Sequence, residues 1–182
     1  YKLQIENYLK KVSDEKFKTI IVRYPNISGA DNMGLLGDRN HKINRIFKTI
    51  FKKIISKKVF NLYCQINKNI YPSRIYAHVE DIAKINIQLI NKKNLGKNKN
   101  FEIFNIISKL NISNYQIFLK MQKLMKKRGR LKFKQADKRE AFFPPTTKDY
   151  ETKKLKIKSQ KTTFKNIINT NIKWFKNIKK EL

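Results

Sequence analysis

The chain has 182 residues, 40% of them hydrophobic, and a formal net charge of +30. This length predicts a single domain with a core of ordinary size. The one cysteine, Cys64, excludes an internal disulfide, and no apolar run approaches the roughly 20 residues that a membrane-spanning helix needs. We therefore expect a soluble, cytoplasmic protein without membrane contact.

Lysine dominates the charge, because 36 of the 43 basic residues are Lys and they occur in every segment. A large positive charge usually indicates a nucleic acid or another anionic partner. Here Lys, Ile and Asn are all used heavily along the chain, as a strong A+T bias in a genome would produce, and no basic arm stands apart. The favoured interpretation is a solvated surface, with nucleic-acid binding kept as the less favoured alternative.

The chain is organised around the stretch from 19 to 38. An apolar strand opens it, and Arg23, Tyr24 and Asn26 come just past the strand's end, before a loop with three glycines. In open α/β sheets, ligands bind beyond the carboxyl ends of strands. The polar residues therefore form a candidate ligand edge. An ordinary core strand that runs into a surface loop explains the pattern equally well.

Hydrophobic periodicity predicts the other elements. The clearest is a helix over 42–57, whose apolar residues recur at steps of three and one and trace a single stripe. Helices are predicted over 2–12, 42–57, 80–91, 115–127, 149–155 and from 163 onward. Strands are predicted over 19–23, 59–64, 74–77, 101–107 and 131–135. This alternation predicts an α/β fold with parallel crossovers.

Several segments resemble, in order, the motifs of one enzyme family. RYPNISGADNMGLLGD is similar to the Arg-Tyr-Phe-Asn, Gly-Ala-Asp and Gly-x-x-Gly-Glu run of UDP-glucose 4-epimerases, which belong to the extended short-chain dehydrogenase/reductase superfamily. YPS with RIYAHVEDIAK resembles their Arg-Asp-Tyr-Ile-His-Val-x-Asp-Leu-Ala segment, and FEIFNI resembles their Tyr-Asn-Leu-Gly strand. KREAFF, the segment from Asp149 to Leu155, and Trp174 resemble later motifs. KLQIE at the start resembles the residues that begin at the active-site Lys.

The resemblance implies the C-terminal half of such an enzyme. Residues 1–182 would form one region, the substrate-binding part of a Rossmann-like fold, and the N-terminal dinucleotide-binding half would lie outside this sequence. The implied reaction interconverts UDP-glucose and UDP-galactose through an NAD-dependent 4-keto intermediate, and the chain alone would be inactive. NAD would be held mainly by the missing half, and the full-length protein would be a homodimer.

Two residues are matched to the cofactor side of the family's site. Lys2 matches the active-site Lys, which holds the nicotinamide ribose and lowers the pKa of the catalytic Tyr, as a cation near a phenolate does. That Tyr would stand four residues earlier, before the chain begins. Tyr24 matches a residue beside the nicotinamide.

Other residues are matched to the nucleotide-sugar. Asn26 matches a residue that hydrogen-bonds the substrate, Arg45 and Ile46 fall where the family contacts it, and Tyr63 is matched to an aromatic that stacks on uracil. Arg74 and Arg139 match arginines on the diphosphate, a task that suits the planar guanidinium fork.

Departures from the family pattern leave alternatives open. Pro25 replaces an aromatic residue, and Ala141 and Phe142 replace Gly-Asp in the Arg139 loop. One alternative is a sister NAD-dependent dehydratase or epimerase that acts on another nucleotide-sugar. The other is a non-catalytic basic module that binds RNA or serves as a scaffold. No metal site is expected, and His78 is interpreted as a packing residue at the start of a helix.

Overall fold

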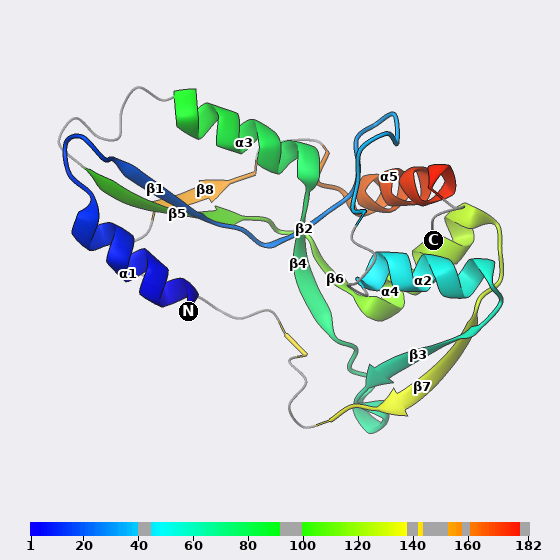
Figure 1. Ribbon diagram of the computed structural model, residues 1–182. Helices are drawn as coiled ribbons and strands as arrows, with labels where there is room; N and C mark the ends of the chain where they lie inside the picture. Colours follow the sequence, from blue (N-terminus) through cyan, green and yellow to red (C-terminus); the bar gives the residue numbers. More distant parts are fainter. Residues whose placement is uncertain (40–44, 92–99, 138–141, 144–152, 158–160, 179–182) are drawn as a thin grey trace.

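The computed structural model describes residues 1–39, 45–91, 100–137, 142–143, 153–157 and 161–178. Figure 1 shows two parts: a sheet flanked by helices, and a group of helices that packs beside a two-stranded ribbon. A second, three-stranded sheet lies between these parts. Parallel strand pairs joined through helices make this a mixed α/β fold, as predicted.

The first sheet has the strand order β1–β5–β8, and both of its pairs are parallel. α1 and α3 lie on opposite sides of it (Figure 1). A small core forms under α3 from Ala77, Ile82 and Ile106. The elements of this part are α1 (Lys2–Val12), β1 (Thr19–Arg23), α3 (Val79–Asn91), β5 (Phe101–Ile107) and β8 (Lys153–Lys156).

The main core lies between three helices and the ribbon β3–β7. The predicted stripe of α2 is buried here, with Ile50 and Phe51 at 0% and 1% exposure, and the ring of Phe51 lies 5.2 Å from that of Phe175. The elements are α2 (Ile46–Ile55), β3 (Val59–Cys64), α4 (Asn114–Met125), β7 (Arg130–Gln135) and α5 (Phe164–Asn177). A short 3-10 helix, η1 (Ile66–Lys68), follows β3.

The connecting sheet has the order β2–β4–β6. β4 (Ser73–His78) runs parallel to β2 (Asn26–Ser28), with Ser28 opposite His78, and antiparallel to β6 (Asn111–Ser113). The loop that follows β1 therefore crosses from the first sheet to the helical part of the molecule. β2 and β6 were not predicted, because three-residue strands are too short to show a period.

Most predicted elements are present, and one is wrong. The helix predicted over 149–155 falls partly outside the described residues, and where the chain is described, 153–156 is the strand β8. The segment forms a strand because β5 offers an edge with which β8 pairs in parallel. This pairing places Leu155 against the core under α3. Apolar and charged residues alternate from Lys154 to Lys158, and this two-residue period is the pattern that predicts a strand.

Candidate functional site

A cavity of about 490 Å³ opens where the loop after β1 meets β4 and the helical part. Four of the residues that the sequence nominated for the substrate line it together: Asn26 from β2, Arg45 and Ile46 at the start of α2, and Arg74 from β4. They come from three segments that are far apart in the sequence. The fold therefore gathers these nominated side chains around one hollow.

Cationic groups dominate the wall of this cavity. The Arg45 Nε lies 2.9 Å from the Asp38 carboxylate, and the Arg74 Nη1 donates to the carbonyl of Ser73 over 2.8 Å. Lys48 also lines the cavity and is only 4% exposed. Three basic side chains against one carboxylate give this wall a net positive charge, which suits an anionic ligand.

The first turn of α2 adds backbone polarity to the same wall. Ile46, Phe47 and Lys48 line the cavity, and the N-cap residue Arg45 makes no side-chain cap. No acidic residue lies in this turn. The first N–H groups of a helix have no acceptor within the helix, and the dipole places partial positive charge there. A helix start of this kind binds phosphate or carboxylate groups.

The side of the cavity formed by β2 is fixed against α5 through Gly29. This glycine has φ of 104°, and a Cβ there would meet the His78 ring at 2.8 Å. Asn171 of α5 donates to the Ser28 hydroxyl over 3.0 Å, and the Ala30 N–H donates to the Thr170 hydroxyl over 3.2 Å. The close approach of backbone to ring needs a glycine, and it holds the loop in place.

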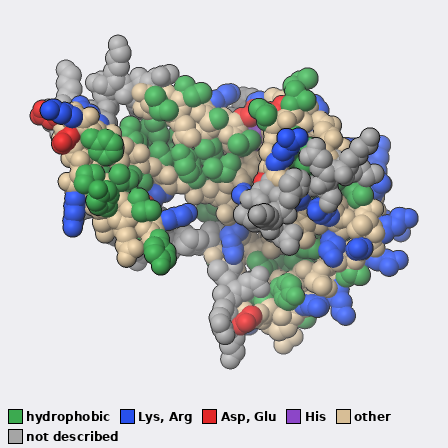
Figure 2. Space-filling view, viewed as in Figure 1, with side chains coloured by type: hydrophobic (Ala, Val, Ile, Leu, Met, Phe, Trp, Pro, Cys, Tyr) green, Lys and Arg blue, Asp and Glu red, His purple; other side chains and the backbone are tan. Residues whose placement is uncertain are grey.

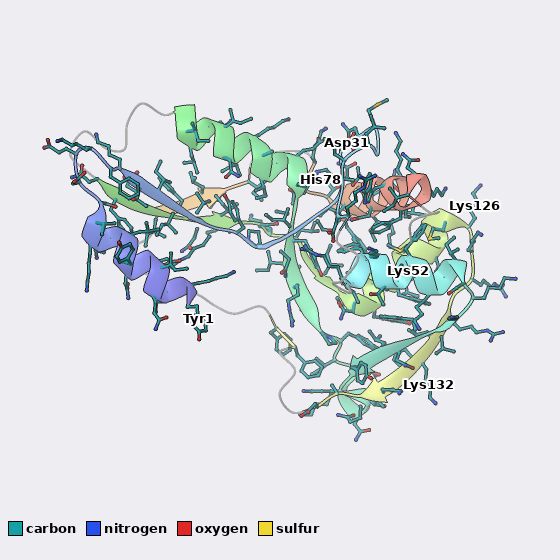
Figure 3. All side chains as sticks on the ribbon, in the orientation of Figure 1. Tyr1, Asp31, Lys52, His78, Lys126 and Lys132 are labelled. Carbon is teal, nitrogen blue, oxygen red and sulfur yellow. The ribbon has the colours of Figure 1, made fainter. Side chains whose placement is uncertain are left out.

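His78 is fully buried, and it connects this loop to α5 (Figure 3). Its Nε2 lies 3.1 Å from the Thr170 hydroxyl, and its Nδ1 accepts from the Glu80 N–H over 3.3 Å. The His78 N–H donates to the Thr162 hydroxyl, which in turn donates to the buried Asp81 carboxylate. His78 is thus a buried, hydrogen-bonded packing residue at the start of α3, as interpreted from the sequence.

Charges around His78 set the titration of this cluster. Burial lowers the pKa of His78, against the opposing effect of Glu80 and Asp81. The hydrogen bond from Lys161 lowers the pKa of Glu80, whose other contacts include the Asn32 N–H. At neutral pH, His78 is therefore neutral and Glu80 is ionised.

Tyr76 also lines the cavity, and burial raises its pKa to about 12. Its ring meets Phe47 edge-on, with centroids 5.3 Å apart. The phenol stays protonated at neutral pH, so Tyr76 can donate a hydrogen bond but cannot act as a base there.

Tyr63 lies outside this cavity but next to it. It lines an adjoining hollow of about 260 Å³ together with Asn61 and Asn114, and Ile46 borders both hollows. The Tyr63 side chain is 46% exposed. Tyr63 is therefore not brought into the main cavity, and the two hollows meet at Ile46.

The two nominated cofactor residues lie at the end of the first sheet. The Tyr24 hydroxyl donates to the Asn86 side chain over 2.6 Å, and Lys2 is exposed on α1. Glu6 binds Arg23 at the end of β1 over 2.6 Å, which ties α1 to that strand end. Lys2 stands four residues before Glu6 on the same helix face. The N-terminus of α1 lies toward the same end of the sheet (Figure 1).

The cavity is also lined by Asp38, Lys48 and Asn171, which were not nominated from the sequence as site residues. Lys48 sits off the apolar stripe of α2, so the pattern predicts exposure, and its burial comes only from tertiary packing. Arg139, which was nominated for the diphosphate, lies outside the described residues. Three residues after it, the Phe142 carbonyl accepts a hydrogen bond from the Ser73 N–H over 2.9 Å.

No cluster of three or more His, Cys, Asp or Glu suited to a metal ion occurs among the described residues. Nor does any helix in the described part of the chain have the length and hydropathy to cross a bilayer.

Comparison with solved structures finds the same fold in several nucleotide-sugar epimerases. The UDP-glucose 4-epimerase from Bifidobacterium longum, in complex with NAD+ and UDP, is 16% identical with a TM-score of 0.72; 99% of this chain is covered and 53% of that one. The UDP-glucose-4-epimerase from Stenotrophomonas maltophila, with bound NAD and formylated UDP-arabinopyranose, is 14% identical with a TM-score of 0.76; 100% of this chain is covered and 55% of that one. The UDP-N-acetylglucosamine 4-epimerase from Methanobrevibacter ruminantium, in complex with UDP-N-acetylmuramic acid, is 18% identical with a TM-score of 0.66; 97% of this chain is covered and 52% of that one.

These likenesses show a shared Rossmann-like fold, and the chain spans about half the length of each structure. None of the curated proteins compared with the chain matches it significantly in sequence. The family described as NAD dependent epimerase/dehydratase matches residues 1–106, which include Asn26, Arg45, Ile46 and Arg74. The chain belongs to the NAD dependent epimerase/dehydratase family.

Proposed function

We propose that this chain is the substrate-binding part of an NAD-dependent nucleotide-sugar epimerase that interconverts UDP-glucose and UDP-galactose. One observation carries the proposal: Asn26, Arg45 and Arg74 line a single cavity, together with the first turn of α2. Guanidinium groups and helix N–H groups are the partners that phosphate oxygens take most readily. A diphosphate fits this cavity better than a neutral ligand does.

Each nominated residue has a distinct task in this proposal. Arg45, Arg74 and the start of α2 bind the diphosphate, with Arg139 as a further guanidinium. Asn26 offers an amide that both donates to and accepts from sugar hydroxyls. Tyr63 stacks on the uracil ring in the adjoining hollow.

The cofactor residues complete the proposed reaction. NAD, when bound, supplies the hydride acceptor and donor for C4 of the sugar. Lys2 holds the nicotinamide ribose, and its ammonium lowers the pKa of a Tyr four residues earlier, so that this Tyr can take the proton of the sugar hydroxyl. Tyr24 borders the nicotinamide. Most contacts to NAD come from a dinucleotide-binding half outside the sequence given.

A sister enzyme of the same family is the second candidate. The Methanobrevibacter enzyme is named as a UDP-N-acetylglucosamine 4-epimerase, and its TM-score to this chain, 0.66, equals that of the UDP-glucose 4-epimerase from Thermotoga maritima. The buried Lys48 adds a cation to the cavity. A substrate whose sugar carries a carboxylate would use that cation, whereas glucose and galactose would not.

Calorimetric titration of the chain with UDP and UDP-glucose tests the proposal. Arg74→Ala should weaken the binding of both ligands by about tenfold or more, because a charge-assisted hydrogen bond contributes about 1.5–3 kcal/mol. Arg128→Ala removes the same charge outside the cavity and should leave both affinities unchanged. Equal affinities in the two variants, or no binding by the parent chain, would contradict the proposed site.

A further inference from the structure

Acidic side chains are missing from the helices and strands of the helical part. Residues 45–78, 108–136 and 161–178 contain 21 Lys and Arg and no Asp or Glu. These ranges supply the three helices and the ribbon of the helical part. A compositional excess of Lys adds positive charge everywhere, but it does not remove carboxylates from one part of a molecule. Charge segregated in this way is the electrostatic footprint of a polyanion-binding protein.

The highest concentration of charge lies where two helices end. α2 and α4 both run into the ribbon, and the register pairs Val59 with Arg130. The turns 56–58 and 126–129, which precede these two residues, therefore lie side by side. A Cβ on Gly129 would lie 3.0 Å from Ile54, in the last turn of α2, which agrees with this placement.

We define the basic edge by six residues on these two helix ends. They are Lys57, Lys58, Lys123, Lys126, Lys127 and Arg128, all exposed. Lys57 and Lys58 follow α2, and the other four lie at the end of α4. None of them forms an ion pair with a residue in the described part of the chain. Figures 2 and 3 show Lys and Arg gathered on this side of the molecule, around the labelled Lys52, Lys126 and Lys132.

Two of these lysines hold a backbone conformation that lysine does not favour. Lys57 and Lys126 have φ of 53° and 51°, the left-handed region. Each closes its helix in the same way, with Lys58 N–H donating to Lys53 C=O over 3.0 Å and Lys127 N–H donating to Gln122 C=O over 3.1 Å. Glycine is the usual residue at this position because it has no Cβ. Two equivalent helix ends thus both carry a charge where glycine would fit with less strain.

The basic edge is also hollowed. A shallow, open depression of about 540 Å³ at the α4 end of the edge is lined by Lys123, Lys126, Lys127 and Arg128, together with Leu119, Gln122 and Gly129. The two turns carry no large apolar side chain, as anchoring in a lipid interface would require. A basic surface with the single apolar side chain of Leu119 beside it suits a phosphodiester backbone better than a bilayer.

We propose that the basic edge binds single-stranded nucleic acid through its phosphates, without reading the base sequence. The site is separate from the cavity between β2, β4 and α2, and it does not depend on the function proposed for that cavity. If about six phosphates are contacted, a plot of the logarithm of the association constant against the logarithm of the salt concentration should have a slope of about −4.

Fluorescence anisotropy with a labelled mixed-sequence RNA of about 16 nucleotides tests this. Lys57→Gly with Lys126→Gly should reduce the slope by about 1.4, because two contacts are lost. The same double variant should melt at an equal or higher temperature than the parent, since glycine relieves the left-handed strain. Loss of binding through unfolding is thereby excluded.

The matched control is Lys11→Gln with Lys16→Gln, which removes equal charge near α1, away from the basic edge. Its affinity and slope should stay near those of the parent, and excess UDP should not displace the RNA. Equal loss in both double variants would overturn the proposal, as would displacement by UDP. Binding to phosphatidylserine vesicles without binding to RNA would also overturn it.

Discussion

At the scale of single residues, the buried His78 makes the fold sensitive to acid. Its pKa is lowered by burial, so the unfolded chain binds more protons than the folded chain once the pH drops below the ordinary histidine value. The stability that depends on neutral His78 is present at neutral pH and is lost as the pH falls. The His78 ring packs against the loop after β1 at Gly29, and Ser28 and Gly29 of this loop line the candidate cavity.

We therefore predict a slope in the free energy of unfolding between about pH 7 and about pH 5. Urea denaturation of the parent should give a free energy that decreases across this window. His78→Gln should flatten the slope while lowering stability at neutral pH, since the contacts of the ring to the Thr170 hydroxyl and the Glu80 N–H are altered. His41→Gln, which replaces the other histidine, should keep the slope. A slope that survives in His78→Gln would assign it to another group.

At the scale of elements, α1 carries an apolar stripe that stays largely exposed in the described chain. The sequence predicted an amphipathic helix over 2–12, and the helix is present, but none of its residues is buried. Ile5 and Tyr8 are 58% and 64% exposed. A helix of 11 residues gains little stability from propensity alone, so this stripe is expected to pack on another surface.

We predict that the chain associates through α1, consistent with the homodimer proposed for the full-length protein. Light scattering after size exclusion should give a mass above the 21.8 kDa of one chain. Ile5→Glu with Tyr8→Glu should return the mass to that of a monomer, because carboxylates are costly to bury in an apolar interface. Lys11→Glu, which lies off the stripe, should not. A parent chain that is already monomeric would contradict the prediction.

At the scale of the whole molecule, the cavity proposed for a nucleotide-sugar and the region proposed for NAD lie in different parts. Asn26, Arg45 and Arg74 surround the cavity, whereas Lys2 and Tyr24 stand at the end of the first sheet. The five glycines of the sequence form no Gly-x-x-Gly-x-x-Gly run, the motif that holds a dinucleotide diphosphate.

The 182 residues by themselves are therefore expected to bind UDP but not NAD. Calorimetry with each ligand measures this, and the UDP titration serves as the control for correct folding. The physical reason is that Lys2 and Tyr24 offer only two contacts, fewer than a dinucleotide needs to offset its loss of motion. Stoichiometric NAD binding by this chain would contradict the division of tasks proposed here.

Local pattern was enough for the elements whose period is long and regular. The stripe of α2 and the strands 19–23 and 101–107 follow from the spacing of apolar residues alone, because burial of one face imposes that spacing. The strand β8 was missed since its partner, β5, lies about fifty residues away in sequence. The resemblance to the epimerases also favoured a helix there, but pairing with the edge of β5 makes the segment a strand.

The sequence by itself determined the α/β class, most of the elements, and the residues that carry charge and amide groups. Only the tertiary structure decided which of them meet. Arg45 and Arg74 share a cavity because β4 pairs with β2 beside the start of α2, and Lys57 lies beside the turn at Lys126–Gly129 because β3 pairs with β7. Strand pairing brings together residues that are far apart in the sequence, and no local pattern of apolar residues records that proximity. The clustering of these basic side chains is therefore a property of the fold and not of any one segment.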